Sequence, residues 1–347
     1  MLTFIAALLV VCWQGAELLQ PDHAAPASAP SAAPLLPKSF ERHEATDAYG
    51  RTITYYIRAP LNETDRLPLV LYIGGSGAQS AWQTVKDTAV LSYGANSIAG
   101  AARGRARVVV VERPGVQFLG AAERPGSAEG SSDEFRREHT LDRWSEANRA
   151  ALDAALKLPG VDPSRVLVAG HSEGGLVACR VAALEPRVTH VTSAAGGGVT
   201  QLFDLMVLAK SGAFCNGAPG PECEQNLIDG WKEVLKDPES SEKMWLGHAY
   251  RRWSSFLASS PLEELAKTDA KIYLAHGSAD QAVAPASCDA LYAQLLSRGR
   301  DVTANRMDGA DHSFGRTDRD GKRIDGWQQL WTDVIIWYLG KPAEPEK

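Results

Sequence analysis

The stretch that decides the fold is Val166-Leu-Val-Ala-Gly170-His-Ser172-Glu-Gly174-Gly175. A run of apolar residues ends here in the pattern Gly-x-Ser-x-Gly, and an apolar, helix-compatible segment follows from Leu176. This order of strand, sharp turn and helix is the context that a nucleophilic serine on a strained turn requires. Gly170 and Gly174 remove side chains that would crowd the turn, and glycine tolerates strained backbone. The pattern predicts that Ser172 is a nucleophile. The alternative is a glycine- and serine-rich turn without catalysis.

The hydrophobic pattern around this stretch predicts strands that alternate with helices. Strands are predicted at 46–49, 52–58, 67–73, 106–112, 165–169, 188–194, 271–276 and 302–307. Helices are predicted at 89–102, 140–158, 173–184, 286–297 and 326–339. Such alternation indicates an α/β fold in which helices cover both faces of a mostly parallel sheet. Residues 199–263 break the rhythm with helical segments rich in Leu, Met and Trp, and we expect them to form a cap over the strand ends. The long polar segment 115–138 is expected to be a loop at the rim of the site or a disordered loop.

The chain has 347 residues, which exceeds the roughly 250–300 residues that one hydrophobic core usually supports. We therefore expect one large domain with an insertion, or two small domains. Hydrophobic residues make up 44% of the chain, and the formal net charge is -6. No cluster of Lys and Arg stands out, so nothing in the sequence points to nucleic acid or to an anionic membrane surface as a partner.

The N-terminal segment 1–20 differs from the rest of the chain. Residues 2–13 form an almost unbroken apolar run, too short to cross a bilayer, which needs about 20 residues. It fits the apolar core of a secretory signal, and residues 21–44 follow as an Ala/Pro-rich spacer expected to be disordered. We predict a periplasmic or secreted protein. One alternative is a lipid anchor at Cys12, and another is a misassigned start that leaves a cytoplasmic tail.

Cysteine usage agrees with export. Cys215 and Cys223 bracket a turn-rich loop and are a candidate disulfide pair, although the sequence leaves open whether they are bonded. Cys179 is in register with apolar residues of the predicted helix after Ser172, so we interpret it as a small buried residue. Cys288 has no evident partner.

A serine hydroxyl needs a base and an acid that orients the base. Asp280 lies just beyond the predicted strand 271–276, and His312 lies beyond the last predicted strand. The order Ser172, Asp280, His312 is the one used by hydrolases with a strained serine turn. The alternative for Asp280 is an aspartate that caps a turn.

Other polar residues near the predicted strand ends receive structural roles. We interpret His171 and His276 as structural neighbours of the site. Asp311 is adjacent to His312 in sequence and badly placed to orient it, so we interpret it as a loop carboxylate.

An oxyanion hole needs two backbone N–H donors. One is expected from Glu173, which follows the nucleophile at a helix N-terminus. The other is expected from the run 74–77, with Ser76 favoured by position and Gly75 next. The alternative for this glycine-rich run is a phosphate cradle, but no Gly-Lys-Ser/Thr or GxGxxG accompanies it. Because HExxH, paired CxxC and EF-hand patterns are absent from the sequence, we predict neither a metal nor another cofactor.

Three motifs together resemble the α/β-hydrolase superfamily. They are Gly-His-Ser-Glu-Gly-Gly at 170–175, His-Gly-x-x-Asp-x-x-Val-x-Pro at 276–285 and Gly-x-Asp-His-Ser-Phe at 309–314. The dienelactone hydrolase and prolyl-oligopeptidase-like branches are nearest, and the resemblance spans roughly residues 45–340. It implies an α/β-hydrolase core at 45–198 and 264–340, a helical cap at 199–263 and a tail at 341–347.

The resemblance also implies that Ser172, Asp280 and His312 form a catalytic triad. Gly74 stands where many relatives have histidine, and Glu173 replaces the tyrosine of prolyl-oligopeptidase-type peptidases, whose N-terminal propeller is also missing from this sequence. These departures favour an esterase over a peptidase.

We therefore expect an exported serine hydrolase that cleaves carboxylic esters through an acyl-enzyme. The substrate would be a small-molecule ester or a short peptide. The alternatives are a small serine peptidase or amidase of the prolyl-oligopeptidase-like type, and a non-catalytic binding protein that keeps the scaffold. The sequence gives neither the physiological substrate nor the oligomeric state.

Overall fold

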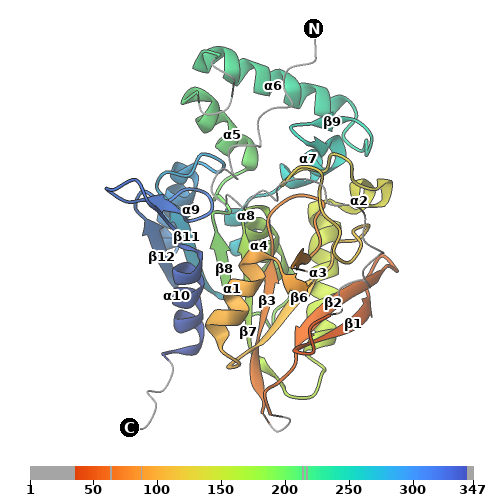
Figure 1. Cartoon of the computed structure of the whole chain (residues 1–347). Helices are drawn as coiled ribbons and strands as arrows, with labels where there is room; N and C mark the ends of the chain where they lie inside the picture. Colours follow the sequence, from red (N-terminus) through yellow and green to blue (C-terminus); the bar gives the residue numbers. More distant parts are fainter. Residues whose placement is uncertain (1–35, 63–64, 87, 213–214, 216–217, 342–347) are drawn as a thin grey trace.

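A sheet of eight strands runs through the middle of the molecule (Figure 1). This computed structural model describes residues 36–62, 65–86, 88–212, 215 and 218–341. The strands, in their order across the sheet, are β1 (Phe40–Thr46), β2 (Thr52–Arg58), β6 (Arg107–Val111), β3 (Leu67–Ile73), β7 (Val161–His171), β8 (His190–Ala194), β11 (Lys271–Gly277) and β12 (Val302–Met307). β1 and β2 are antiparallel to each other, as are β2 and β6, and the remaining neighbours are parallel.

Helices cover both faces of this sheet, because successive side chains of a strand point to opposite faces. On β7, Val166 and Val168 belong to one hydrophobic core, whereas Leu167 and Ala169 belong to the other. The first core is closed by α3 (Leu141–Ala155), α4 (Glu173–Leu184), α8 (Pro261–Leu265) and α9 (Pro285–Ser297). The second is closed by α1 (Tyr93–Ala102) and α10 (Trp327–Leu339).

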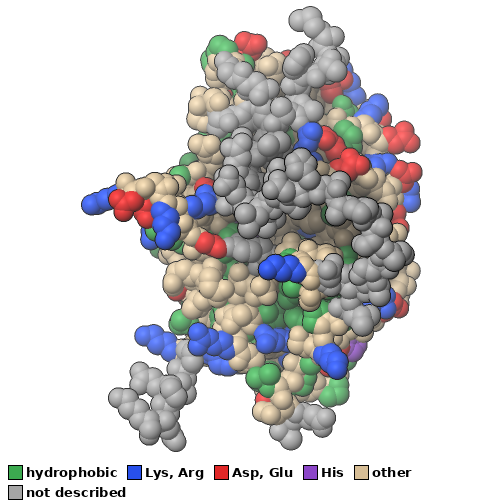
Figure 2. All heavy atoms as spheres, in the orientation of Figure 1, with side chains coloured by type: hydrophobic (Ala, Val, Ile, Leu, Met, Phe, Trp, Pro, Cys, Tyr) green, Lys and Arg blue, Asp and Glu red, His purple; other side chains and the backbone are tan. Residues whose placement is uncertain are grey.

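The chain leaves the sheet after β8 and returns at β11, and the intervening segment forms most of the cap (Figure 1). It contains α5 (Gln201–Lys210), α6 (Gly220–Lys236), β9 (Met244–Trp245), β10 (His248–Ala249) and α7 (Tyr250–Phe256). These elements share a small core of their own, which includes Trp245 and Trp253 with ring centroids 5.1 Å apart. Figure 2 shows acidic and basic side chains interspersed over this end of the molecule.

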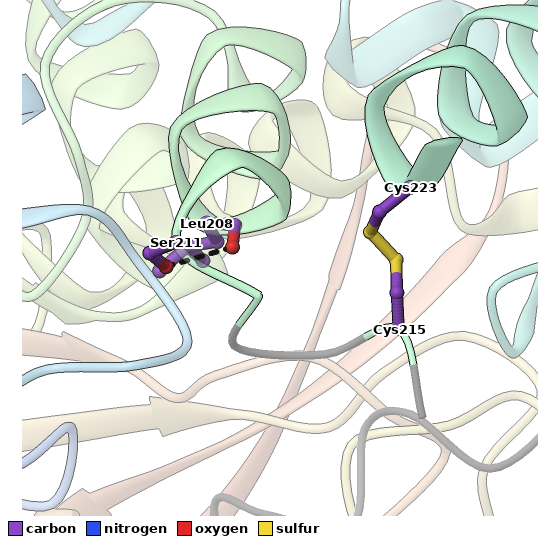
Figure 3. The surroundings of a disulfide bond; sticks show 4 residues. All are labelled: Leu208, Ser211, Cys215 and Cys223. Carbon is purple, nitrogen blue, oxygen red and sulfur yellow. Dashed lines mark hydrogen bonds between the residues drawn. A yellow bond between two sulfur atoms is a disulfide. The ribbon is translucent and has the colours of Figure 1, made fainter. Parts of the chain in front are cut away.

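A disulfide joins Cys215 to Cys223 at the start of α6 (Figure 3). Cys223 is fully buried in the cap core, so the bond ties the preceding loop to that core. Cys179 and Cys288 are both buried free thiols.

The first strand begins earlier than the sequence pattern indicates. The predicted strand 46–49 is wrong, because Asp47 caps a turn: its Oδ1 accepts hydrogen bonds from the amides of Tyr49 (3.0 Å) and Arg51 (2.9 Å). The strand is Phe40–Thr46, so assigning residues 40–44 to the disordered spacer is wrong as well. Predictions for the signal segment, for the spacer up to residue 35, for Cys12 and for residues 342–347 lie outside the described residues.

The predicted helix 89–102 begins later, at Tyr93. Thr88–Leu91 is instead strand β5, which pairs with β4 (Trp82–Val85) in a hairpin. The buried Trp82 ring packs edge-on against Phe40 and Tyr56, which fixes this hairpin against the sheet. The helix α2 (Asp133–Glu138) lies in the segment 115–138 that is predicted as a loop. A second ribbon joins β13 (Arg316–Thr317) to β14 (Arg323–Ile324), for which the sequence pattern makes no prediction. In the described part of the chain, no helix has the length and apolar character that a membrane span needs.

A buried aspartate connects the cap to the sheet domain. The buried carboxyl group of Asp204 in α5 lies beside Ser287 of α9 and the backbone of Ala284 just before that helix. Burial raises the pKa of Asp204 to about 8, and the negative charge of Asp280 raises it further. Asp204 is therefore protonated in the folded protein at pH values where an unfolded aspartate, with a pKa of about 3.9, is ionised.

This difference predicts a pH-dependent stability. Because the folded state holds a proton at Asp204 that the unfolded state has lost, the stabilisation is complete below about pH 4 and declines as pH rises to about 8. The Asp204→Asn variant keeps a neutral, isosteric side chain. Its melting temperature, measured against wild type by circular dichroism, should improve progressively from pH 5 to pH 8.5. Exposed Asp320→Asn is the control and should show no such trend; a constant difference between Asp204→Asn and wild type would contradict the assignment.

Candidate active site

Ser172 occupies a strained turn between β7 and α4. Its backbone angles are φ 56° and ψ -127°, a conformation that L-residues rarely adopt. A Cβ atom on Gly170 would collide with the Gly174 carbonyl, and one on Gly174 would collide with the carbonyls of Ile73 and Gly74. The two glycines of the motif are therefore needed because backbone segments approach each other closely, and the resulting turn exposes the Ser172 hydroxyl at the carboxyl edge of the sheet.

Three side chains that are distant in sequence form one chain of hydrogen bonds at this edge. Nε2 of His312 lies 2.9 Å from Oγ of Ser172, and Nδ1 of His312 lies 2.9 Å from Oδ2 of Asp280. Ser172 follows β7, Asp280 follows β11 and His312 follows β12, so all three stand at the carboxyl ends of parallel strands. With the proton on Nδ1, Nε2 is an acceptor for the serine hydroxyl proton.

The electrostatics of this chain suit a base held ready by a carboxylate. Burial alone would lower the pKa of His312, but the charge and hydrogen bond of Asp280 more than offset it and place the pKa above its ordinary value. Burial likewise opposes ionisation of Asp280, yet the attraction of His312 and His276 lowers the Asp280 pKa. Asp280 is therefore ionised, and its Oδ1 also accepts hydrogen bonds from the amides of Ala282 (2.8 Å) and Val283 (2.9 Å).

The other histidines near the strand ends support this arrangement. Nε2 of His171 bonds the carbonyl of His312 (3.0 Å), and burial lowers the pKa of His171 to about 3, so the ring is neutral. Nε2 of His276 bonds the carbonyl of Val283 (3.2 Å) and lies 3.4 Å from Asp280. Asp311 accepts from backbone amides of its own loop and pairs with Arg323 at 2.8 Å.

Two of the predicted oxyanion-hole residues, Gly75 and Glu173, lie beside Ser172. A Cβ atom on Gly75 would lie 3.3 Å from Cβ of Ser172, so the loop after β3 passes directly next to the nucleophile. In the part of the chain that the structure describes, no backbone carbonyl accepts a hydrogen bond from the amide N–H of Gly75 or Ser76. Glu173 is the first residue of α4, where amide groups have no acceptor within the helix. Amides from two separate segments are thus available at one place.

Sequence reasoning missed a buried group of charges around the Glu173 side chain. One carboxylate oxygen lies 2.8 Å from Nε2 of His139, and the other accepts from Nε (3.1 Å) and Nη2 (2.7 Å) of Arg252. Arg113 lies 4.0 Å away. All four side chains are nearly inaccessible to solvent.

Opposing effects set the ionisation of this group. Burial alone would raise the Glu173 pKa, but His139, Arg252 and Arg113 hold it well below the ordinary value. Burial lowers the pKa of His139, although the negative charge and the hydrogen bond of Glu173 oppose this shift. Removing one partner from a buried ion pair typically costs about 3–5 kcal/mol, so the pairing of Glu173 with Arg252 fixes the cap helix α7 against α4. Within the described residues, no group of three or more His, Cys, Asp or Glu side chains could hold a metal ion.

Comparison with known proteins agrees with this architecture. The family profile described as "Alpha/beta hydrolase family" matches residues 70–321, more than half of the chain. The chain therefore belongs to the alpha/beta hydrolase family, which confirms the predicted fold and the predicted superfamily. No curated protein matches the chain.

Solved structures with the same fold include both Est1E and peptidases. Est1E from Butyrivibrio proteoclasticus has a TM-score of 0.53 at 15% identity, over 86% of this chain and 99% of that chain. A puromycin-hydrolyzing peptidase of Mycobacterium tuberculosis has a TM-score of 0.56 at 17% identity, over 88% of this chain and 40% of that chain. The acylaminoacyl peptidase of Pyrococcus horikoshii has a TM-score of 0.55 at 16% identity, over 89% of this chain and 43% of that chain. The chain thus spans less than half the length of these peptidases, and at such identities the likeness shows the fold alone.

Proposed function

We propose that this alpha/beta hydrolase is a serine hydrolase that cleaves carboxylic esters through an acyl-enzyme. The observation that carries the proposal is the continuous hydrogen-bond chain from Ser172 through His312 to Asp280. A neutral imidazole in contact with a serine hydroxyl, and oriented by a buried carboxylate, is the arrangement that activates serine as a nucleophile.

The reaction proceeds in two steps. Oγ of Ser172 attacks the ester carbonyl carbon while His312 takes the hydroxyl proton at Nε2, and Asp280 stabilises the imidazolium. The tetrahedral oxyanion accepts hydrogen bonds from the amides of Glu173 and the loop at Gly75 and Ser76. The intermediate collapses as His312 returns the proton to the leaving alcohol. Water, activated by His312, then attacks the acyl-serine and releases the acid.

An ester is favoured over a peptide because of the charges beside the nucleophile. Recognition of a free peptide terminus needs a charged side chain that faces the substrate. Glu173 and Arg252 instead pair with each other in the buried group described above, and Arg113 lies against the same carboxylate.

We also propose that the protein acts outside the cytoplasm, in the periplasm or as a secreted enzyme. The apolar run at residues 2–13 supports export, as does the disulfide between Cys215 and Cys223, because disulfides persist in oxidising compartments.

Labelling by a fluorophosphonate probe tests the nucleophile. Wild-type protein should be labelled at Ser172, and Ser172→Ala should lose both labelling and ester hydrolysis down to the background rate, since no oxygen remains to form the acyl bond. The exposed Ser297→Ala is the matched control and should label like wild type. A folded wild-type protein that resists the probe, or equal labelling of Ser172→Ala, would end the proposal.

A substrate panel tests the leaving group. A chain-length series of nitrophenyl esters, run beside peptide anilides, should give kcat/KM values at least about 10²-fold higher for the best ester than for the best anilide. Higher values for an anilide would instead establish the peptidase alternative. Absence of turnover on every member, together with no labelling, would support a non-catalytic binding protein.

The pH dependence of kcat/KM tests the base. Protonated His312 cannot accept the serine proton, so activity should fall on the acid side with an inflection above the ordinary histidine value of about 6.5. In Asp280→Asn the burial of His312 is no longer opposed by the carboxylate. The inflection should therefore move down, and kcat should fall by about 10⁴-fold. Asp311→Asn removes a weaker influence and should shift the inflection less. An inflection in Asp280→Asn at or above the wild-type value would contradict the assignment.

A further inference from the structure

The guanidinium of Arg113 lies against the backbone of the loop that follows β3. Its Nη2 atom donates hydrogen bonds to the carbonyl oxygens of both Gly74 (3.2 Å) and Gly75. Arg113 follows β6 and packs over the ring of Trp144, with its Cζ atom 5.1 Å from the ring centroid. It is only 8% exposed, so it acts on this loop from inside the protein.

Because a peptide bond is planar, these two hydrogen bonds also fix the directions of the N–H groups in the same two peptide units. In a trans peptide the N–H points opposite to the C=O of the same unit. Because the carbonyls of Gly74 and Gly75 both point toward Arg113, the N–H groups of Gly75 and Ser76 point away from it. These are the loop amides that the proposed mechanism assigns to the oxyanion.

Arg113 is in turn held by the residue that supplies the other amide. Its guanidinium lies 4.0 Å from the carboxylate of Glu173, whose second oxygen is held by Arg252 of the cap helix α7. Arg252 also donates to Gln201 of α5 at 3.0 Å. The same chain of charges therefore runs from the cap, through the helix after the nucleophile, to the glycine loop.

An uncharged set of contacts holds the far end of that loop independently of Arg113. The hydroxyl of Ser76 donates to the Gly126 carbonyl (3.2 Å), which Nε2 of His248 also contacts (2.8 Å). The amide of Ala78 donates to the Ser127 carbonyl (3.1 Å). The loop should therefore keep its position without Arg113 and lose only the orientation of its first two peptide planes.

We propose that Arg113 is a positioning residue that orients the Gly75 and Ser76 amides toward the developing oxyanion. The Glu173 carboxylate, which is itself held by Arg252, keeps the guanidinium in place. The inference rests on the proposed function, since it assigns the cause of oxyanion stabilisation in that reaction. Among the described residues, no hydrogen bond or ion pair joins Arg113 to Ser172 or His312, so its contribution belongs to the transition state and not to the base.

The test compares Arg113→Met and Arg113→Lys with a buried arginine elsewhere. Arg107 is also buried, and it too donates to two carbonyls, those of Arg58 and Pro159; it begins β6, whereas Arg113 follows the other end of that strand. Arg107→Lys is therefore the matched control.

On the best nitrophenyl ester, Arg113→Met should lower kcat by about 10²–10³-fold, the usual cost of one lost oxyanion donor, with KM within about threefold. Arg113→Lys keeps the positive charge but cannot reproduce the hydrogen bonds to both carbonyls. Its kcat should therefore lie between those of Arg113→Met and wild type. Arg107→Lys should keep the wild-type kcat.

Two further measurements separate orientation from a general loss of structure. The acid-side inflection of kcat/KM should stay at its wild-type pH in both Arg113 variants, because the His312–Asp280 pair is untouched. A trifluoromethyl ketone that matches the best acyl chain forms an oxyanion on Ser172, and its inhibition constant should rise in parallel with the loss of kcat. The corresponding methyl ketone should bind as it does to wild type.

The outcomes distinguish this inference from the proposed function. If wild type hydrolyses the ester but both Arg113 variants keep kcat within threefold, the inference is wrong. The inference is also wrong if the Arg113 substitutions raise KM instead of lowering kcat. It is wrong as well if they raise the inhibition constants of the trifluoromethyl ketone and the methyl ketone to the same extent. If Arg113→Met does not fold, the same measurements on Arg113→Lys and wild type test the inference. A wild-type protein that neither labels nor turns over would instead overturn the proposed function itself.

Discussion

The structure depends on the close approach of three backbone segments around the turn at Ser172. The end of β7, the first turn of α4 and the loop after β3 meet at distances that only glycine allows at residues 170 and 174. That approach forces Ser172 into a left-handed conformation and brings the glycine loop beside its hydroxyl. The strain is held by the surrounding sheet, whose central strands β3 and β7 are buried on both faces. A polar site can stand at this edge because the sheet beneath it is rigid.

Much of this arrangement follows from the sequence by a short physical argument. Parallel strands end at a common edge, so residues just beyond buried apolar runs must meet there, and this reasoning brings Ser172, Asp280 and His312 together. The observed bounds of β2 (52–58) and α4 (173–184) agree with the predicted bounds, because the hydrophobic periodicity of both segments is strong. The first strand was misplaced because its alternation is weak and its edge position leaves many polar residues exposed. Residues 89–91 are predicted as the start of a helix because they are apolar and adjoin the helical pattern, which does not reveal their pairing with β4.

The buried charges could not be predicted in the same way. Arg113, His139 and Arg252 come from three segments whose packing no periodicity specifies, and each is a residue type that is usually exposed or intermediate in burial. Of these three residues, only Arg113 could have been suspected from the sequence, because it follows a predicted buried strand at the edge where the site forms. From the sequence, Glu173 is predicted to contribute its backbone amide at a helix N-terminus, and no partner of its side chain is predicted. The structure instead buries its side chain in an ion pair, which gives it a connecting function that sequence position alone does not indicate.

The cap segment begins after Gly198 and ends near Leu262, whose amide donates a hydrogen bond to the Gly198 carbonyl (3.1 Å). Its two junctions are therefore close together, and the insertion adds a module without changing the order of any strand. Such a segment can be exchanged or lengthened during evolution while the catalytic edge stays intact, so lineages with this core can diversify in substrate preference by altering a single contiguous stretch. The Arg252–Glu173 pair sets one condition on that divergence: a replacement module has to supply a cation at the same place.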